Sequence, residues 1–417
     1  MPRLVTQSIL AIFVFASACA SAEVYVQDHG IWRRARGVSV GQQVWAFQSS
    51  YQRASQRFSN SREVQPLGHS YARTVTWRDL LRAEPSIQAR ERLEDYVQTR
   101  GIGLDEVAAS AEYDLEREEV GFSVDWAYGL TARWMIGFQV PLMHRRTRVE
   151  TDVRFTPELA QGSGVDVRHS ALALTRTELR ERVQGLAEEE LANSGYDSIP
   201  DEQQSWDVGD VSLLSQVAFI DAPDWKWSLQ QIVRFPTARN SSIADYFQTA
   251  GDEGQVDLGL TSLLDHHVRR WTWGLRLGYV AQLPDTLKMR VPSTQSGSPE
   301  VDPNVSRDLG DWVWASMDSE YRMTARLDLH LEYAFLAKAQ DRYDGGNLEG
   351  IEYDHLAAGT EQELHQSRLG VQYRLSDTTE RNGIENKWVA SLGYVYPWIG
   401  RNSVDASRTT LELITYF

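Results

Sequence analysis

The chain has 417 residues, a net charge of −16 and a negative mean hydropathy, yet it contains 14 tryptophans and 17 tyrosines. The acidic balance argues against a nucleic-acid partner, which would require a basic face. After the N-terminal residues, no apolar run is long enough for a membrane-spanning helix. Composition therefore leaves two classes open, an acidic soluble protein and a membrane β-barrel with acidic loops.

Residues 1–22 have the pattern of a secretory signal peptide. Arg3 supplies a positive charge, Ile9–Ala16 is apolar, and an A-x-A cleavage site ends at Ala22. The only cysteine, Cys19, precedes this site, so the exported chain would contain no thiol and no disulfide. A lipoprotein with Cys19 as the lipidated residue is the alternative. We expect an exported protein that consists of residues 23–417.

A two-residue alternation of apolar and polar side chains then recurs along the chain. In Trp271–Leu283 the odd positions are apolar or aromatic, and the even positions are small or polar except for Val280. This period places the two sets on opposite faces of a strand, one toward lipid and one toward a wet lumen. The predicted strands are Gly37–Phe47, Glu112–Tyr128, Trp134–Leu142, Val211–Phe219, Trp225–Phe235, Val256–Leu264, Trp271–Leu283, Val313–Met323, Leu327–Ala339, Leu369–Leu375, Trp388–Trp398 and the C-terminal stretch Thr410–Phe417.

The connections between these strands alternate between short and long. Short periplasmic turns and long extracellular loops are typical of outer-membrane barrels, whereas the strands of a soluble β-sandwich are usually shorter. The pattern predicts an all-β fold, a transmembrane antiparallel up-and-down barrel of about twelve strands. His69–Leu81 could add a strand, so fourteen is the alternative. Two amphipathic helices are predicted in long connections. One lies within Pro85–Ser110, and the other, Ala171–Asn193, lies in the connection from residue 145 to residue 205.

The C-terminus supports a location in the outer membrane of a Gram-negative bacterium. The chain ends at Phe417, with Leu411 and Leu413 on the same face of the last strand. A terminal aromatic residue after alternating apolar residues resembles the signal that barrel proteins offer to the barrel assembly machinery. We therefore expect three kinds of partner: this machinery through Phe417, outer-membrane lipid with lipopolysaccharide, and a small-molecule ligand.

Ionisable and amide side chains occupy the inward phase of the predicted strands. We predict that Arg234, Arg276, Glu332 and Arg368 line the path of a solute through the lumen. Charges of both signs either pair into a closed plug or line a water-filled route, because unpaired burial is costly. The full inward set is Asp125, Arg133, Gln139, Asp210, Arg234, Asp257, Arg276, Asp318, Glu320, Asp328, His330, Glu332, Lys338, Arg368, Gln372, Arg374 and Glu412.

The sequence offers no arrangement typical of catalysis. A G-x-S-x-G pattern spans Gly37–Gly41, but it lies in a predicted strand and not at a strand-to-helix turn, and Ser39 has no recognisable histidine partner. A lipid hydrolase is therefore disfavoured. His266 and His267 are adjacent, so on a strand they face opposite sides and cannot easily share a metal. We predict no enzymatic activity, no cofactor and no metal.

Three stretches resemble the outer-membrane transporters grouped as the MetA-pathway of phenol degradation family. They are Y-G-L-T-A-R-W-M-I-G-F-Q-V-P-L at residues 128–142, W-D-V-G-D-V-S-L at residues 206–213 and Q-V-D-L-G-L at residues 255–260. Ala132 and Asp207 depart from the Asp and Gly of the family pattern. The resemblance implies a barrel related to channels for fatty acids and aromatic hydrocarbons, and it transfers no catalytic residue.

These observations together predict a function. We expect an outer-membrane channel for passive uptake of small, hydrophobic or aromatic molecules. The alternative is a closed structural or surface-interaction barrel without transport activity.

Overall fold

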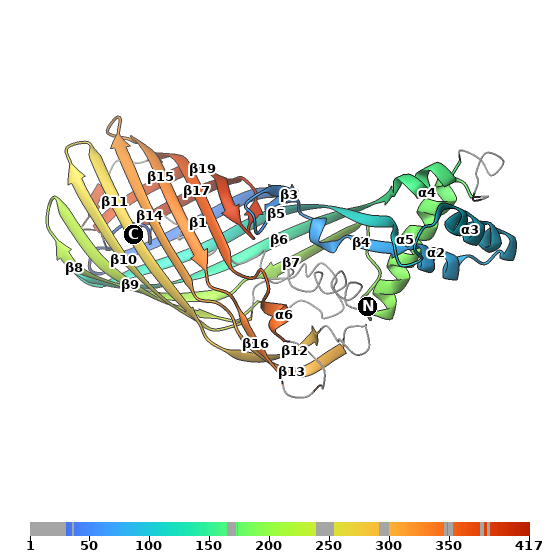
Figure 1. Cartoon of the computed structure of the whole chain (residues 1–417). Helices are drawn as coiled ribbons and strands as arrows, with labels where there is room; N and C mark the ends of the chain where they lie inside the picture. Colours follow the sequence, from blue (N-terminus) through green and yellow to red (C-terminus); the bar gives the residue numbers. More distant parts are fainter. Residues whose placement is uncertain are drawn as a thin grey trace.

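Twelve antiparallel strands form a closed barrel in the computed structural model, as the sequence predicts (Figure 1). The structure describes residues 31–35, 37–164, 172, 174–238, 254–291, 300–345, 348, 353–375, 379–381 and 384–417; the predicted signal peptide lies outside them. Each wall strand pairs with the wall strands before and after it in the chain, and the first, β1, pairs with the last, β21, to close the circle. The wall strands are β1 (Gln43–Ala54), β5 (Val107–Thr131), β6 (Trp134–Phe155), β8 (Val211–Asp221), β9 (Trp225–Phe235), β10 (Asp257–Val268), β11 (Trp271–Gln282), β14 (Trp312–Arg322), β15 (Leu327–Lys338), β17 (Gln362–Arg374), β19 (Ile384–Arg401) and β21 (Arg408–Tyr416).

The strands expose apolar side chains and bury polar ones, the reverse of a soluble protein. On β11, Trp273 and Leu277 are each 51% exposed, whereas Arg276 between them is 2% exposed. The other wall strands repeat this inversion, with exposed leucines and aromatic residues on the outside. Lipid is the solvent that such a face requires, and a closed barrel leaves no strand edge unpaired within it. The predicted alternation is therefore confirmed.

Short turns and both ends of the strand series lie at one end of the barrel, which we call the short-turn end (Figure 1). The β5–β6, β8–β9, β10–β11 and β14–β15 turns lie there, and the long connections lie at the opposite, long-loop end. The terminal residue Phe417 donates its N–H to the Gln43 carbonyl and accepts one from the Gln43 N–H, at 2.9 and 3.0 Å. The two ends of the chain's strand series are thereby joined.

The first wall strand differs from the prediction of Gly37–Phe47, because β1 begins only at Gln43. Gly41 has a φ of 77°, a left-handed conformation that interrupts an extended chain. Its N–H donates to the Gly129 carbonyl of β5 at 2.8 Å. The stretch before β1 is therefore a turn across the end of β5.

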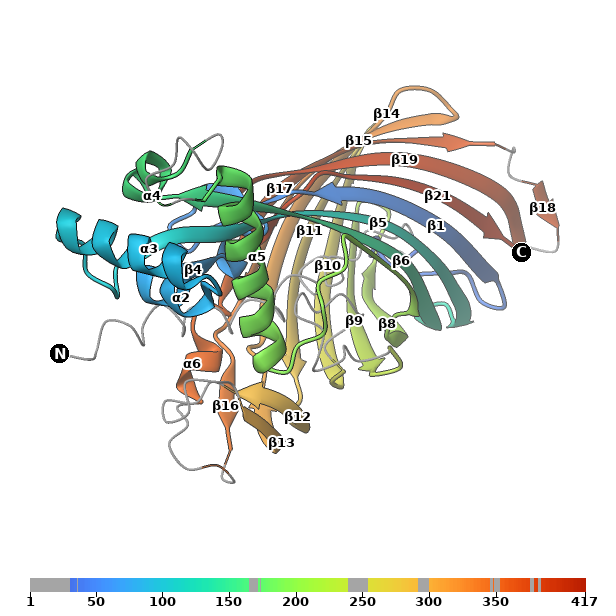
Figure 2. The same cartoon turned by 90° about the vertical axis from the view of Figure 1, so that its right-hand side faces the viewer.

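The β5–β6 hairpin is longer than predicted and continues beyond the barrel (Figures 1 and 2). The long connection expected from residue 145 begins only after Phe155, since charged side chains on both faces of β6 find partners on neighbouring strands. Arg146 donates to Glu202 of β7 (Glu202–Val208) at 2.5 Å, and Arg145 donates to Glu119 of β5 at 2.9 Å. Strand β4 (Arg73–Thr76) and β7 pair only with this projecting part, so they are not wall strands.

Helices gather at the far end of this hairpin. Both predicted helices are confirmed, as α3 (Ile87–Arg100) and α5 (Arg176–Asn193), with α2 (Trp77–Ala83) and α4 (Pro157–Gly162) beside them (Figure 2). The possible strand at His69–Leu81 is wrong over most of its length. Thr76 caps α2 in a capping box with Asp79, so the chain turns helical and buries Trp77 in the helical core.

All but one of the remaining elements lie at the long-loop end. They are β2 (Gln56–Phe58), β3 (Val64–Pro66), η1 (His69–Tyr71), β12 (Asp285–Val291), β13 (Glu300–Asp308), β16 (Arg342–Asp344), α6 (Asp354–Ala357) and β20 (Val404–Asp405), with the short β18 (Thr379–Arg381) beside β19 at the opposite end. None of the helices in the described part of the chain is both long and apolar enough to cross a membrane.

Candidate functional site

A short piece of chain ahead of β1 lies inside the barrel. Residues 31–35, of sequence I-W-R-R-A, leave the turn over Gly129 and enter the lumen; we call them the lumen segment. Trp32 is 1% exposed and packs over Gly137 of β6, where an added Cβ would meet the indole at 2.5 Å. Ile31 and Trp32 join an apolar cluster with Ala46, Ala127 and other inward residues at the short-turn end.

Inward side chains of the wall bind the backbone of the lumen segment. Arg276 of β11 donates from Nε to the Arg33 carbonyl at 2.7 Å, and Gln216 of β8 donates to the Arg34 carbonyl at 2.9 Å. The Ala35 N–H donates to the Asp265 carboxylate of β10 at 2.8 Å. These bonds satisfy polar groups that would otherwise be buried without partners.

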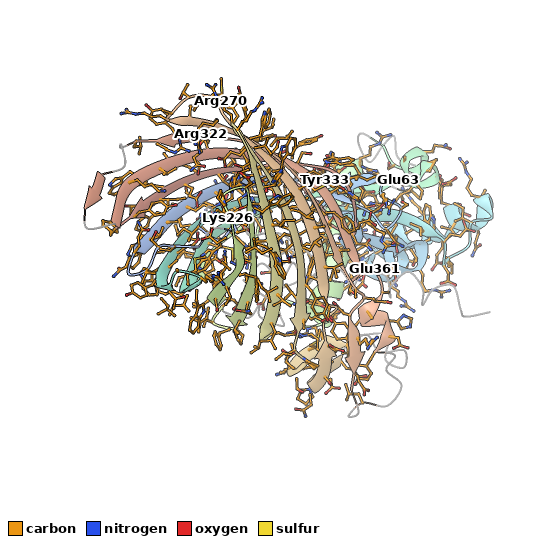
Figure 3. All side chains as sticks on the ribbon, turned by 90° about the vertical axis from the view of Figure 1, so that its left-hand side faces the viewer. Glu63, Lys226, Arg270, Arg322, Tyr333 and Glu361 are labelled. Atoms are coloured by element: carbon orange, nitrogen blue, oxygen red, sulfur yellow. The ribbon has the colours of Figure 1, made fainter. Side chains whose placement is uncertain are left out.

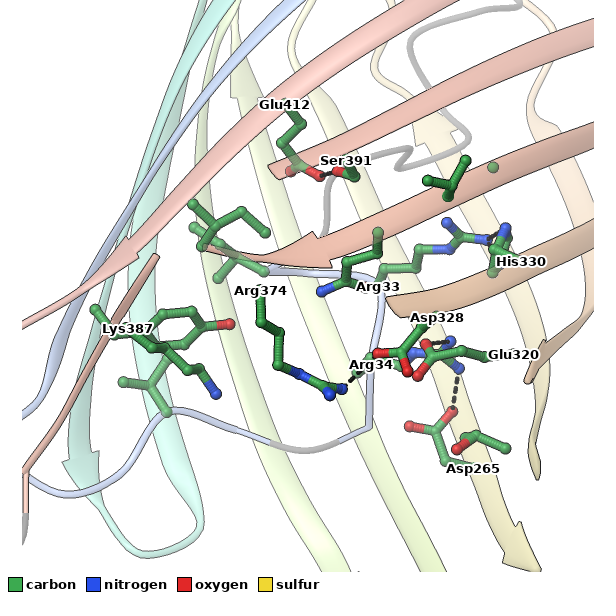
Figure 4. Close-up of a pocket in the computed structure, with 18 of the residues that line it drawn as sticks. Arg33, Arg34, Asp265, Glu320, Asp328, His330, Arg374, Lys387, Ser391 and Glu412 are labelled. Carbon is green, nitrogen blue, oxygen red and sulfur yellow. Dashed lines mark hydrogen bonds and ion pairs between the residues drawn. The ribbon is translucent and has the colours of Figure 1, made fainter. Parts of the chain in front are cut away.

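The two arginines of the lumen segment pair with carboxylates on β14 and β15. Arg33 donates to Glu332 at 2.8 Å and also contacts His330. Arg34 donates to Asp318 at 2.9 Å and to Glu320 at 2.6 Å, and Figure 4 shows Arg34 beside Glu320 and Asp265. The segment thus contacts the wall from β6 round to β15, across the lumen.

Asp318 is the centre of this network. It is 3% exposed and accepts from Arg34 at 2.9 Å, while its other oxygen lies 3.0 Å from Arg276 Nη2. Arg276 also donates to Asp265 at 2.9 Å. Two carboxylates and two guanidinium groups share these contacts, which offsets the cost of removing the four charges from water.

Gly274 makes room for the pair of Arg276 and Asp318. An added Cβ at Gly274 would lie 2.1 Å from Asp318 Oδ1 and 2.3 Å from Arg276 Nη1. Gly278, four residues on, makes room for the indole of Trp314 instead, because an added Cβ there would lie 2.0 Å from Trp314 Nε1. Only the first of these glycines therefore serves the ionic network.

We expect Gly274→Ala to lower the free energy of unfolding by about 1–3 kcal/mol, because the methyl group displaces two buried charged groups. The loss of stability is measured as a lower midpoint of thermal unfolding in detergent, and unfolding is monitored by the gel mobility of unboiled samples. Gly185→Ala in α5 is the control, since an added Cβ there meets no atom within 4 Å. Equal midpoints for the two variants would contradict the role given to Gly274.

A cavity of about 280 Å³ opens beside the lumen segment at the short-turn end (Figure 4). Its lining includes many charged residues: Arg33, Arg34, Lys226, Arg368, Arg374, Lys387, Asp265, Glu320, Asp328 and Glu412. Arg374 pairs with Asp328, and Ser391 donates to Glu412 at 2.9 Å. The cavity can therefore hold water and a polar or weakly ionic solute.

An apolar cluster lies on the inward face nearer the long-loop end. There Trp312 and Trp314 of β14 pack with Phe58 of β2 and with inward residues of β11, β15 and β17; the latter are Val280, Ala334, Leu336 and Leu364. The long-loop end of the lumen thus holds this apolar cluster as well as buried ion pairs such as Arg234–Asp257. This cluster was not predicted, because only polar residues were assigned to the inward face, although Trp314 stands in the same phase as Asp318.

The structure brings together three of the four residues predicted to line the lumen. Arg276 and Glu332 bind the lumen segment, and Arg368 lines the cavity beside it. Arg234 lies near the other end of its strand and pairs with Asp257 at 3.3 Å. Of the wider inward set, Arg133 is exposed in the β5–β6 turn and does not point inward.

The histidine pair and the serine of the G-x-S-x-G pattern do not form a catalytic arrangement with one another in the described residues. His266 faces outward and stacks on Trp225, with ring centroids 3.9 Å apart, while His267 lines the cavity. Ser39 also lines the cavity, and within the described ranges its hydroxyl bonds to no histidine. No group of three or more His, Cys, Asp or Glu side chains in the described residues is placed to hold a metal.

The chain matches no family model and no curated protein sequence. Its fold is similar to that of the COG4313 outer membrane channel from Pseudomonas putida F1, with a TM-score of 0.51 and 10% identity over 92% of this chain and 98% of that one. The translocator domain of the autotransporter NalP from Neisseria meningitidis and a deletion mutant of the TodX monoaromatic hydrocarbon channel have TM-scores of 0.35 and 0.34, each at 9% identity, over 91% of this chain and 89% and 90% of theirs. The first similarity supports an outer-membrane barrel fold, and the other two are too distant to add to it.

Proposed function

We propose that this barrel is an outer-membrane channel for passive uptake of a small, hydrophobic or aromatic molecule, and that the lumen segment closes it. The observation that carries the proposal is that the lumen is occupied by chain outside the wall. Residues 31–35 are held by hydrogen bonds and ion pairs to the side chains of Arg276, Asp318 and Glu332, and they are not part of any wall strand. A segment held in this way can leave without unfolding the barrel.

The substrate class rests on the apolar cluster at the long-loop end of the lumen. Trp312, Trp314 and Leu364 present apolar groups inward, and a hydrophobic solute would displace little bound water from them. The resemblance of residues 128–142 to transporters of the MetA-pathway of phenol degradation family favours the same class. Arg368 would then contact the solute in the cavity at the short-turn end, whereas Arg234 would stand near its entry.

A closed structural barrel is the second candidate, and the pairing of Arg34 favours it. This guanidinium lies within 4 Å of three carboxylates: Asp318, Glu320 and Asp265. Such a network would also suit a lumen that never opens. The two candidates predict different permeability.

Uptake of a radiolabelled aromatic hydrocarbon by Gram-negative cells tests the channel. Cells that make the wild-type protein should take up the compound faster than cells without it, and cells with the Arg33→Gln/Arg34→Gln variant faster still. A sugar of similar size, offered to the same cells, measures selectivity. If neither form moves either compound, the closed barrel is the correct function.

The remaining partners follow from the same placement. We propose that the protein resides in the outer membrane of a Gram-negative bacterium, with the short-turn end toward the periplasm and the long loops among lipopolysaccharide. The barrel assembly machinery would recognise the last strand through Phe417, which is 52% exposed. Replacing Phe417 by Ala and measuring the amount of inserted barrel tests this recognition.

A further inference from the structure

A groove of about 450 Å³ crosses the lipid-facing wall from β9 to β17. Two rows of side chains, each paired from strand to strand, form its banks: Trp225, His266, Trp273, Ser319 and Leu331 on one side, and Leu264, Leu275, Met317, Tyr333 and Ser367 on the other. Between the rows, Asp318 and Glu332 turn their side chains into the lumen, so backbone forms the floor. The short side chains of Ser319 and Ser367 leave the space open.

The groove rises from the barrel rim toward the middle of the wall. Trp225 is the first residue of β9, directly after its short turn. Leu331, in the same row, lies four positions after Leu327, the first residue of β15. The row therefore moves away from the short-turn end as it passes from β9 to β15. An acyl chain of a lipid in the leaflet at the short-turn end also runs from the rim toward the middle of the membrane.

Arginines gather at the rim below the groove (Figure 3). Arg269 and Arg270 are exposed in the β10–β11 turn, and the Arg322 N–H at the end of β14 donates to the Arg270 carbonyl at 2.8 Å. Trp271 lies between them and the groove, with its ring centroid 4.6 Å from that of Tyr321. Within the described ranges no carboxylate pairs with Arg269 or Arg270, whereas Arg322 lies 3.5 Å from Asp328.

We propose that the groove binds an acyl chain of one anionic phospholipid of the periplasmic leaflet, whose phosphodiester is bound by Arg269 and Arg270. The site rests on the membrane orientation proposed above. Positive charge at the rim selects an anionic headgroup over a zwitterionic one, and the aromatic side chains are suited to the interface between headgroup and acyl chain. The apolar banks and the backbone floor then accept the chain.

Native mass spectrometry of the full-length barrel, taken from bicelles with equal phosphatidylglycerol and phosphatidylethanolamine, tests the site. We expect one retained phosphatidylglycerol per wild-type barrel. Arg269→Gln and Arg270→Gln should each lower its retention over phosphatidylethanolamine by roughly fivefold at low ionic strength. Ser319→Phe should fill the groove and lower retention of both lipids.

Ser49→Phe is the matched control, because Ser49 faces lipid on β1, away from the groove. The site is wrong if wild-type barrels retain both lipids equally, or if Ser319→Phe retains as much phosphatidylglycerol as Ser49→Phe. A chain that does not insert into vesicles at all would overturn the membrane placement and the lipid site together. Retained phosphatidylglycerol in a barrel without solute uptake would support the lipid site and contradict only the channel.

Discussion

The Arg33→Gln/Arg34→Gln variant should conduct ions at least about tenfold better than the wild-type barrel in planar bilayers. In the closed state the substitutions weaken the pairing of three carboxylates: Glu332 loses Arg33, Glu320 loses Arg34, and Asp318 keeps Arg276 but loses Arg34. An uncompensated buried charge costs about 3–5 kcal/mol. In the open state water reaches these carboxylates, so the equilibrium moves toward a barrel with the lumen segment displaced.

The control is Arg53→Gln/Arg62→Gln, which removes the same charge from the outer surface. Arg53 pairs with Glu116 and Arg62 with Glu363, and side chains of both arginines are about half exposed, at 59% and 48%. This variant should conduct like the wild type. A folded lumen-segment variant with wild-type conductance would show that residues 31–35 do not close the channel.

Asp318→Ala should lower the free energy of unfolding by about 3–5 kcal/mol. The substitution removes the carboxylate that pairs with Arg34 and Arg276 at 2.9 and 3.0 Å, and Arg276 then loses one of its two carboxylate partners and keeps Asp265. Urea titration of the barrel in lipid vesicles, followed by tryptophan fluorescence, measures the loss.

Asp105→Ala is the comparison for this titration. Asp105 pairs with Arg78 at 2.8 Å at the helical end, where both side chains are largely exposed to water. Exposed ion pairs contribute little to stability, so this variant should unfold at the wild-type urea concentration. If Asp318→Ala behaves in the same way, the ionic network does not hold the lumen together.

The barrel could be predicted from the sequence because lipid imposes a simple rule on every wall strand. Trp271, Trp273 and Leu277 had to face one solvent and Arg276 another, and this requirement shows directly as a period of two. The strand count followed from the repeat. The ends of the strands were harder to predict, since the charges that continue β6 past Leu142 look like loop residues until Glu119 and Glu202 supply partners.

The lumen segment could not be predicted, because it belongs to no repeating pattern. Residues 31–35 precede the first strand, and their positions depend on carboxylates about three hundred residues away along the chain, such as Glu332. Two signals were present: adjacent arginines ahead of the barrel and an excess of inward acids on β14 and β15. Pairing them requires the three-dimensional register of the wall, which alternation alone does not provide.

Covalent attachment to β1 sets how the lumen segment can behave once it has left the lumen. Only residues 36–42 separate it from Gln43, the first residue of the wall. A short tether holds a ligand at an effective concentration in the millimolar range, whatever the volume outside. Re-entry is therefore unimolecular and independent of protein concentration, and a free peptide of the same sequence would compete poorly. Opening events should be brief and should recur on the same molecule.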